Sequence, residues 1–549
     1  MVWYWWKLGL LVLLLVLTSI ARSSARSEEA YATLLYGDEF VLGVRVLGKS
    51  IRDTGSTKDM VVLVSDGVSD YAKRLLQADG WKVELISLLA NPNQVRPKRF
   101  WGVYTKLKIF NMTAYSPIVY LDADTIVVKN IEDLFQCRGF CANLKHSERL
   151  NSGVLVVEPS NSLFKDMMSK VNSLPSYTGG DQGFLNSYYG DFANARLFEP
   201  NLPAEARKSK PVPEMERLST LYNADVGLYM LANKWMVDEK ELKVIHYTLG
   251  PIKPWDWWAV WLVKPVEVWQ DVRMQLKESL PGTGRGANPS EWLLIKFLFA
   301  FPLIVLLICY YRSCLQVNMD LWSIFCRISI CDRVKLLYYK FRTSGGLPTY
   351  SAVGVTSPST GNPNQQFING TNSKIPAYLG PTSVFFCITS ALFSLALAFI
   401  ITPRQVTPWT GLLLMYEWTS MAFFVTFGSY LRLVYNRGRL AATQTGRNFN
   451  HVDISNHDSG KGHQRHLSDW DAVTCFYGTG IAFLAVIAPS LPCIFGISAL
   501  FARLGLMIGG GMVLAIFMTY ASEQLALRAF VKGMEDRDLP RTRAICLLC

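Results

Sequence analysis

The pattern of hydrophobic and polar positions divides the chain into two parts of different texture. Between residues 29 and 275, short β-like runs alternate with stretches of helical periodicity. Met60–Ser65 is a continuous apolar run of strand length, and Val41, Val44 and Leu47 recur on one face of a predicted helix at Phe40–Ile51. Such alternation favours a parallel sheet with helices on both faces. The other predicted elements are strands at Tyr31–Leu35, Lys82–Ser87, Ser116–Leu121 and Leu242–Ile245, and helices at Tyr71–Ala78 and Tyr104–Met112.

Beyond residue 292 the apolar runs approach the ~20 residues that a bilayer-spanning helix needs. The predicted spans are 292–311, 378–402, 409–431, 472–497 and 504–522. They follow a linker at 276–291 and are separated by long polar loops at 312–377 and 432–470, with a tail at 523–549. Glu417 lies in the middle of the third predicted span, where a carboxylate is costly and its role is open.

The N-terminus resembles a secretory signal peptide at residues 1–25. Lys7 precedes the short apolar run Leu8–Leu17, and small residues follow it. An uncleaved anchor helix is the alternative. In both cases the next segment, residues 29–275, is expected to enter the secretory lumen.

Charge supports this topology. The formal net charge is +12, and beyond residue 292 the basic residues gather in the two long loops and the tail, whereas the short loops between the spans hold only Arg404 and Arg503. This is the distribution expected when basic loops stay cytosolic. The positive charge is therefore a topology signal, and nucleic acid is not an expected partner.

The 11 cysteines include no CxxC pair, so a zinc ribbon is not indicated. Cys137 and Cys141 are four residues apart in the predicted luminal domain, where a local disulfide is possible.

Two acids follow directly on a predicted strand. Asp122 and Asp124 flank Ala123 at the end of Ser116–Leu121. Ligands of α/β sheets bind beyond the carboxyl ends of strands, and two carboxylates in one turn can converge on a hard divalent ion. A D-x-D triplet alone is common by chance, but its position after an apolar strand strengthens the hypothesis of a metal site.

A second cluster follows the short strand at Leu242–Ile245. His246 can complete a metal shell, Gly250 permits close approach of a phosphate, and Lys253 supplies a positive charge for it. An aromatic loop stiffened by proline, with only a structural role, is the alternative reading.

These motifs, with four others, resemble glycosyltransferase family eight, the glycogenin-like enzymes. The ordered set is Thr33-Leu-Leu-Tyr-Gly-Asp38, Thr105-Lys106-Leu107, Leu121-Asp-Ala-Asp124, Asn151-Ser-Gly153, Gly180-Asp181-Gln182-Gly183 and His246 to Lys253-Pro-Trp. The resemblance implies a Rossmann-like nucleotide-sugar transferase domain of GT-A type, here followed by a multi-span α-helical membrane domain. It also implies an enzyme that uses a UDP-sugar and Mn²⁺ and retains the anomeric configuration.

The resemblance assigns roles by position. Mn²⁺ would be held by Asp122, Asp124 and His246. Uridine would lie against Leu34, Tyr36, Gly37 and Phe40, the last of which stands where the family has tyrosine. The sugar and phosphates would meet Lys106, Ala123, Asn151, Ser152, Gly153, Asp181, Gln182, Gly250 and Lys253. Among these, Asp181, Gln182 and Lys253 are the candidate catalytic residues.

The branch with a fused multi-span half implies transfer of glucuronate from UDP-glucuronate to a sphingolipid, inositol phosphorylceramide, in the Golgi membrane. A uronate needs a cation, for which the candidates are Lys106, Arg96, Arg99 and Lys145. Tryptophans at 255, 257, 258, 261 and 269 suggest an active site that faces lipid headgroups, with core packing as the alternative. The competing functions are a xylan-type glucuronosyl- or glucosyltransferase and a non-catalytic multispan lipid-binding or transport protein.

Overall fold

The computed structural model describes residues 28–92, 102–145, 148–201, 213–248, 250–315, 375–447 and 468–536. The predicted signal at 1–25 lies outside these residues, as do Arg96 and Arg99. The chain divides into two compact units. We call the first the α/β unit (residues 1–297, Phe399–Tyr416 and Val486–Met512) and the second the helical unit (Leu298–Ala398, Glu417–Ala485 and 513–549). The α/β unit thus contains residues 29–275 and also two short C-terminal segments.

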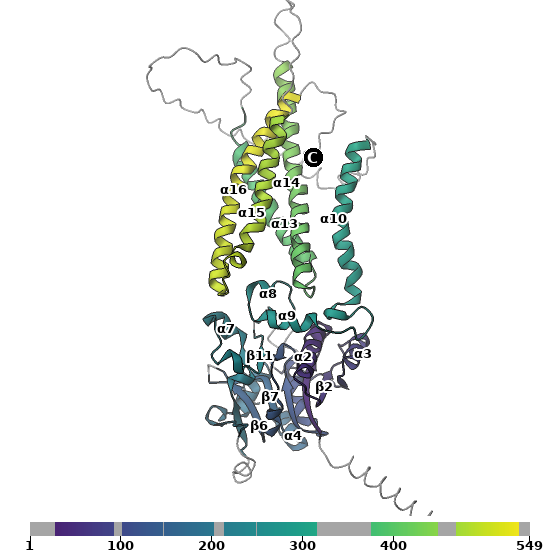
Figure 1. Ribbon diagram of the computed structural model, residues 1–549, viewed down its shortest axis with the longest axis vertical. Coiled ribbons are helices and arrows are strands. Elements are labelled where there is room, and N and C mark those ends of the chain that lie inside the picture. The colour runs from purple at the N-terminus through teal and green to yellow at the C-terminus, as the bar shows by residue number, and fades with distance from the viewer. Residues whose placement is uncertain are drawn as a thin grey trace, which may run out of the picture. The chain divides into compact units, whose positions relative to one another are not determined.

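An eight-stranded mixed sheet forms the centre of the α/β unit (Figure 1). Its strands, in spatial order, are β3 (Lys82–Leu85), β2 (Asp59–Val64), β1 (Glu28–Leu35), β4 (Tyr115–Leu121), β7 (Leu150–Val157), β6 (Phe140–Leu144), β9 (Met215–Leu218) and β8 (Arg196–Leu197). The strands from β3 to β4 are parallel, as predicted, but β7 runs antiparallel to both β4 and β6. The predicted parallel sheet is thus confirmed for the first four strands, but the whole sheet is mixed, and the short connection between β6 and β7 allows only antiparallel pairing of these two strands.

Two apolar clusters cover the two faces of this sheet. Along β1, Tyr31 and Leu35 join a cluster with Val44 and Leu47 of α2, whereas Leu34 joins the other cluster with Tyr104 and others. This is the two-residue alternation expected of a strand buried on both faces. The covering helices are α2 (Val41–Asp53), α3 (Asp70–Ala78), α4 (Asn161–Lys170), α5 (Asp181–Tyr188) and the 3₁₀ helices η3 (Val103–Asn111) and η4 (Glu132–Gln136).

The predicted strands and helices at these positions are confirmed to within a few residues, except that Tyr104–Met112 is a 3₁₀ rather than an α-helix. Further elements are η1 (Asp38–Phe40), η5 (Phe192–Asn194), η6 (Thr220–Tyr222), η7 (Glu239–Glu241), η8 (Gly284–Gly286), α7 (Val226–Ala232), α8 (Ala259–Leu262) and α9 (Val266–Met274).

A small second sheet fixes the position of the Asp122–Asp124 turn. It consists of β10 (Ala224–Asp225), β11 (Val244–His246) and β5 (Thr125–Val127). β5 begins directly after Asp124, and its pairing with β11 sets His246 opposite Thr125. Helix α2 packs closely under the turn, since a Cβ on Gly43 would lie 2.6 Å from the carbonyl oxygen of Ala123.

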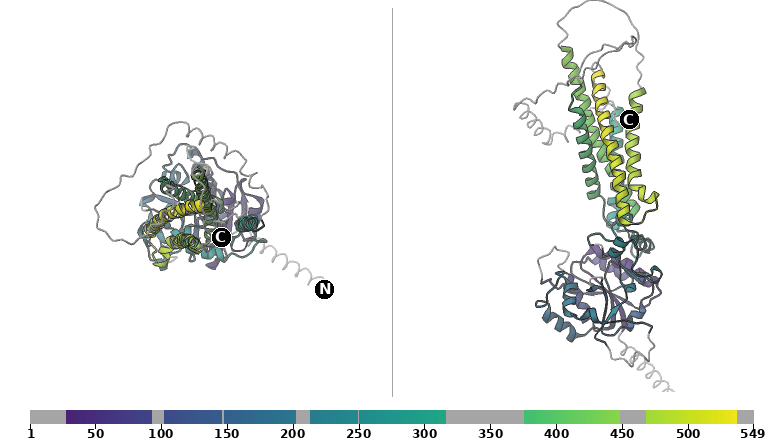
Figure 2. Two further views of the ribbon diagram at one scale, coloured as in Figure 1. Left: turned by 90° about the horizontal axis from the view of Figure 1, so that it is seen from above. Right: turned by 90° about the vertical axis from the view of Figure 1, so that its left-hand side faces the viewer.

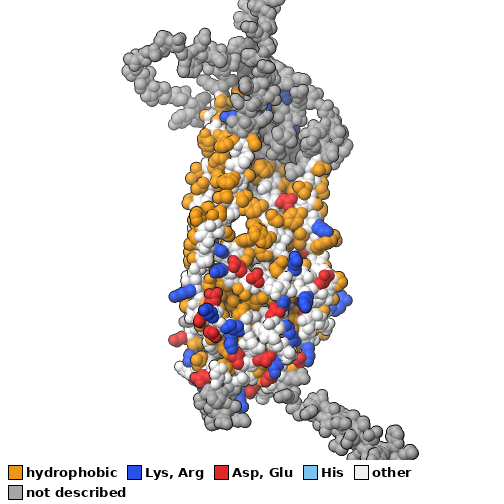
Figure 3. Space-filling view, viewed as in Figure 1, with side chains coloured by type: hydrophobic (Ala, Val, Ile, Leu, Met, Phe, Trp, Pro, Cys, Tyr) orange, Lys and Arg blue, Asp and Glu red, His pale blue; other side chains and the backbone are white. Residues whose placement is uncertain are grey.

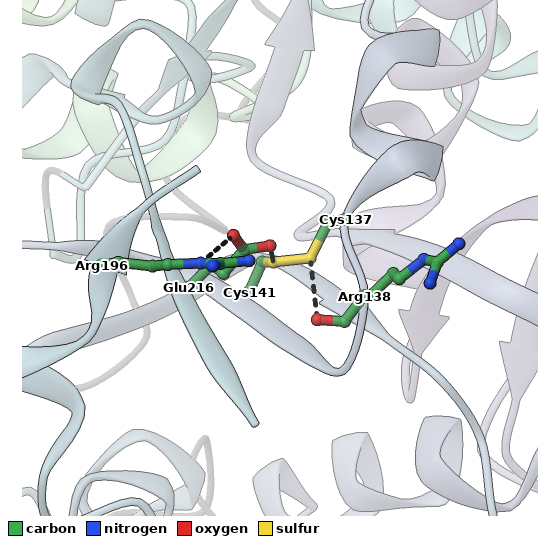
Figure 4. Close-up of a disulfide and its surroundings, with 5 residues drawn as sticks. All are labelled: Cys137, Arg138, Cys141, Arg196 and Glu216. Atoms are coloured by element: carbon green, nitrogen blue, oxygen red, sulfur yellow. Dashed lines mark hydrogen bonds and ion pairs between the residues drawn. A yellow bond between two sulfur atoms is a disulfide. The ribbon is translucent and has the colours of Figure 1, made fainter. Parts of the chain in front are cut away.

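Cys137 and Cys141 form a disulfide between η4 and β6, which confirms the pairing considered from the sequence (Figure 4). Glu216 lies beside Cys141 and accepts a hydrogen bond of 2.9 Å from Arg196. Because both thiols are used by the disulfide, this group does not offer two thiolates to a metal.

Five helices of the second part overlap the five predicted spans. They are α10 (Pro289–Leu315), α13 (Leu379–Ile401), α14 (Pro408–Arg447), α15 (Ser468–Ile494) and α16 (Leu500–Glu535). Within the described residues, three segments are long and apolar enough to cross a membrane: Leu379–Ile401, Cys475–Ile494 and Leu500–Glu535. For α10 and α14, a span remains a prediction.

Within the helical unit, α13 to α16 lie side by side (Figure 2). A shared core joins them, with Cys387 of α13, Phe427 of α14, Tyr477 of α15 and Ala526 of α16. Large apolar side chains also cover the outer surface of these helices, where Figure 3 shows mostly hydrophobic atoms. A bundle that is apolar both inside and outside is typical of a membrane domain.

Candidate metal and donor site

The site begins at the carboxyl end of β4. The buried strand delivers Asp122 and Asp124 into a tight turn, in which the backbone N–H of Asp122 donates to the carbonyl of Gly153 and that of Thr125 to the carbonyl of Asp122. On the other side, the N–H of Tyr247 donates to the carbonyl of Asp124. The turn is thus fixed to β7 and to the loop after β11.

Three side chains of this region form a candidate metal centre. One ligand atom each from Asp122, Asp124 and His246 lies within 4.8 Å of the others. The Nε2 atom of His246 is 3.4 Å from Asp124 Oδ1 and 4.0 Å from Asp122 Oδ2. Two carboxylates and one imidazole suit a divalent ion such as Mn²⁺ or Mg²⁺. The sequence-predicted ligands are therefore close together, although they come from segments far apart in the chain.

The orientation of His246 favours metal binding. Its Nδ1 atom is 2.9 Å from Oδ1 of Asn223, whose Nδ2 donates to Asn151 Oδ1. This network assigns the ring proton to Nδ1, which leaves the lone pair of Nε2 directed to the two carboxylates. Gly153 makes room for the ring, because a Cβ there would lie 2.1 Å from Cε1 of His246.

Two lysines balance the carboxylates. Lys253 Nζ is 2.7 Å from Asp124 Oδ2, and Lys106 Nζ is 2.9 Å from Asp122 Oδ1 and 3.1 Å from Asp181 Oδ2. Burial would raise the pKa of Asp124, but Lys253 and His246 outweigh it and hold that pKa well below its usual value. Burial would likewise lower the pKa of Lys106, but Asp122 and Asp181 raise it above its usual range. Both groups are therefore charged at neutral pH.

A polar network connects the remaining candidates. Asp181, at the start of α5, accepts a hydrogen bond of 2.9 Å from Ser152 Oγ, and Gln182 Oε1 accepts one of 3.2 Å from Asn151 Nδ2. Asn151 and Ser152 lie on β7, next to the Asp122 turn on β4. Asp181 and Gln182, two of the three predicted catalytic residues, therefore lie near the candidate metal ligands, with Lys106 between Asp122 and Asp181.

The residues expected around uridine form an aromatic group at the end of β1. The rings of Tyr36 and Phe40 are 5.1 Å apart, and Phe40 lies 5.9 Å from the ring of Trp255. Leu34 is buried beside them, and burial raises the pKa of Tyr36 above its usual value, so its hydroxyl stays neutral. Gly37 lies between β1 and η1.

Gly250 has a positive φ of 65°, and a Cβ there would meet open space. Its backbone conformation, which other residues rarely adopt, is what requires glycine at this position.

Sequence reasoning missed several residues of the site. Tyr120 donates to Asp122 Oδ1 at 2.7 Å, and its position on β4 two residues before Asp122 was a usable signal. Asn223 belongs to no motif, so nothing in the sequence pointed to it.

A further residue that the sequence did not indicate is Arg149. Its guanidinium stacks 4.1 Å from the ring centre of Tyr177, whose hydroxyl accepts a hydrogen bond from Gln182. Among the predicted uronate cations, Lys145 is paired with Asp225 at 3.0 Å.

The interfacial reading of the tryptophans is wrong for three of them. Trp255, Trp257 and Trp269 are buried, and Trp255 and Trp269 pack with Tyr247 in a core under the small sheet. Only Trp258 and Trp261 keep partial exposure. Their size and apolar surface made burial the stronger preference.

No protein-family model matches the chain. The chain is 61% identical to inositol phosphorylceramide glucuronosyltransferase 1 of Arabidopsis thaliana, over 99% of both chains. It is 36% identical to putative UDP-glucuronate:xylan alpha-glucuronosyltransferase 3 of the same plant, over 42% of this chain and 35% of that one. Mouse glycogenin-1 is 30% identical over 42% of this chain and 66% of its own.

A solved structure of galactosyltransferase LgtC covers 48% of this chain and 99% of its own, at 17% identity and a TM-score of 0.35, which is too low to support an inference. The 61% identity to inositol phosphorylceramide glucuronosyltransferase 1, over almost the whole of both chains, shows the family. The chain belongs to the glycogenin-like glycosyltransferases, in the family of inositol phosphorylceramide glucuronosyltransferase 1.

Proposed function

We propose that this protein transfers glucuronate from UDP-glucuronate to inositol phosphorylceramide, with Mn²⁺ as cofactor and with retention of configuration. The observation that carries the proposal is the convergence of Asp122, Asp124 and His246 beside Lys253 and Asp181. The sugar and the acceptor come from the relative that matches 99% of this chain, whereas the xylan-directed relative matches 42%.

The donor set of the site fits Mn²⁺, which when bound would stabilise the negative charge of the departing diphosphate. Lys253 is the protein's own cation at the same place, and we assign it to the diphosphate. We assign Gln182 and Asp181 to the sugar. Asn151 orients Gln182, and Lys106 and Ser152 orient Asp181.

Asp181 serves to orient the sugar rather than to attack it. Its Oδ2 atom is already engaged by Lys106 at 3.1 Å and by Ser152 at 2.9 Å, which weakens it as a nucleophile. In this account the acceptor hydroxyl attacks the anomeric carbon on the face that the diphosphate leaves. A phosphate oxygen of the leaving group takes the acceptor's proton.

The apolar helices α13, α15 and α16 support a membrane location, which we place in the Golgi with the α/β unit in the lumen. A membrane-bound enzyme suits a lipid acceptor. The N-terminal segment would direct this topology.

A product assay tests the function directly. The full-length protein, purified in detergent, should transfer glucuronate to inositol phosphorylceramide when given UDP-glucuronate and Mn²⁺, as measured by mass spectrometry of the lipid. UDP-glucose and xylan oligosaccharides serve as the competing donor and acceptor. Asp124→Asn should reduce the rate at least about a hundredfold, the scale of one strong electrostatic group. Transfer to xylan oligosaccharides in place of the lipid would contradict the proposal.

Asn223 gives a test of the metal site. Asn223→Ala removes the acceptor that orients His246, so the Mn²⁺ dissociation constant, measured by electron paramagnetic resonance, should rise about 10–100-fold. The matched control is Asn194→Ala, which alters an exposed asparagine. Equal Mn²⁺ affinity in the two variants would show that Asn223 does not orient a ligand.

Asp181 separates the two routes to retention. If it only orients the sugar, Asp181→Asn should keep turnover within about tenfold of the wild type, because loss of a covalent nucleophile costs far more. Mass spectrometry of the protein with a slow donor analogue should find no sugar on Asp181. A trapped glycosyl ester at that residue would rule out the orienting role.

Glycosylation tests the orientation of the chain. Asn111 and Thr113 belong to an Asn-X-Thr acceptor sequence and are exposed, so Asn111 should carry a glycan if the α/β unit is luminal. The shift on glycosidase digestion should disappear in Asn111→Gln. Asn369, in another Asn-X-Thr sequence outside the described residues, should stay bare. A glycan on Asn369 would refute the proposed topology.

A further inference from the structure

The loop between α13 and α14 belongs to the α/β unit and contacts other segments of that unit. Its residues 402–407 form hydrogen bonds with segments that are distant in sequence. The N–H of Trp257 donates to the carbonyl of Arg404 at 3.1 Å, Gln405 Nε2 donates to the carbonyl of Glu39 at 2.8 Å, and Arg273 Nη1 donates to the carbonyl of Val406 at 3.3 Å. The loop is therefore held by three separate segments of the α/β unit.

Arg404 makes the strongest contact of this loop. Its Nε and Nη2 atoms form a bidentate pair with the carboxylate of Asp256, at 3.1 and 2.9 Å. Asp256 is fully buried, whereas the Arg404 side chain is 60% exposed. A buried carboxylate is strongly unfavourable without a charge partner, and Arg404 is the cation paired with it among the described residues.

Asp256 in turn holds the loop that carries Lys253. Its Oδ2 atom accepts from the backbone N–H of Lys253 at 2.9 Å, and Arg404 Nη2 also donates to the carbonyl of Pro251 at 3.3 Å. The Lys253 ammonium is 2.7 Å from Asp124. A continuous series of hydrogen bonds and ion pairs thus connects Arg404, Asp256, Lys253 and the candidate metal ligand Asp124.

We propose that Arg404 is a positioning residue of the donor site, which holds Asp256 and thereby fixes Lys253 for the diphosphate of the UDP-sugar. The inference rests on the proposed function, since it assigns Lys253 to the diphosphate. It makes the α13–α14 loop a part of the donor site. Residues 29–275 alone would lack this support, so donor binding depends on the C-terminal half of the chain.

Arg503 provides a matched control. It lies near the start of α16, in the other C-terminal segment of the α/β unit, and its Nη1 atom donates to the carbonyl of Trp261 at 3.0 Å. Arg503 thus also connects a C-terminal segment to the region after β11, but none of its contacts reaches Asp256 or Lys253. If UDP binding only required the C-terminal segments to be attached to the α/β unit, substitution of either arginine would weaken it equally.

The test measures UDP binding to the full-length protein in detergent, by calorimetry in the presence of Mn²⁺. Arg404→Ala should raise the dissociation constant of UDP about tenfold, within the range for residues of one hydrogen-bond network. Arg503→Ala should change it by less than about twofold. The double variant Arg404→Ala, Asp256→Asn should bind UDP more tightly than Arg404→Ala alone, because the neutral amide needs no counter-charge and can still accept from Lys253.

The double variant also covers the case in which Arg404→Ala does not fold, since it leaves no unpaired buried charge. In that case its UDP affinity is compared with that of Asp256→Asn alone, and equal affinities would support the pairing. Equal weakening by Arg404→Ala and Arg503→Ala would overturn the inference while wild-type UDP binding upholds the proposed function. Absence of UDP binding by the wild type would instead overturn the proposed function.

Discussion

The pairing of β11 with β5 is the constraint on which the site depends. It sets His246 opposite Thr125, the residue that follows the Asp122–Asp124 turn, and so joins two segments that are far apart in the sequence. The register of a strand pair is fixed by which side chains reach the core. Val244 is buried in the main core and Ile245 under the small sheet. A shift by one residue would move His246 away from the carboxylates and expose this apolar surface.

Several charged side chains of the site are largely buried, and ion pairs between opposite charges offset the cost of removing them from water. Asp122, Asp124 and Asp181 face the ammonium groups of Lys106 and Lys253. Such a cluster is stable when each charge has a partner, and it is ready to exchange partners when a cation and a diphosphate enter. In the proposed reaction, Lys253 would change partner from Asp124 to phosphate, while Lys106 would keep Asp181 in place.

The α/β unit is not a self-contained domain followed by membrane anchors. It includes Phe399–Tyr416 and Val486–Met512 from the C-terminal half, and the first of these segments supplies the partner of the buried Asp256. Trp257 packs against the same segment, because a Cβ on Gly411 would lie 2.3 Å from its ring. The residues that supply Arg404 lie directly between α13 and α14, so this support of the proposed donor site and these helices belong to one continuous stretch of chain.

The sequence by itself determined the features that local pattern encodes. Hydrophobic periodicity predicted the positions of the strands, because a buried strand requires apolar residues at regular positions in the sequence. The two acids after Ser116–Leu121 predicted the edge of the sheet at which the candidate site lies. Local pattern does not encode which distant segments pair. Only the tertiary structure therefore decided the reversed direction of β7, the role of Asn223 behind His246 and the pairing of Arg404 with Asp256. The tryptophans after Lys253 show the same limit, since an aromatic side chain can lie in a core or at a membrane surface, and only the tertiary structure shows that three of them are buried.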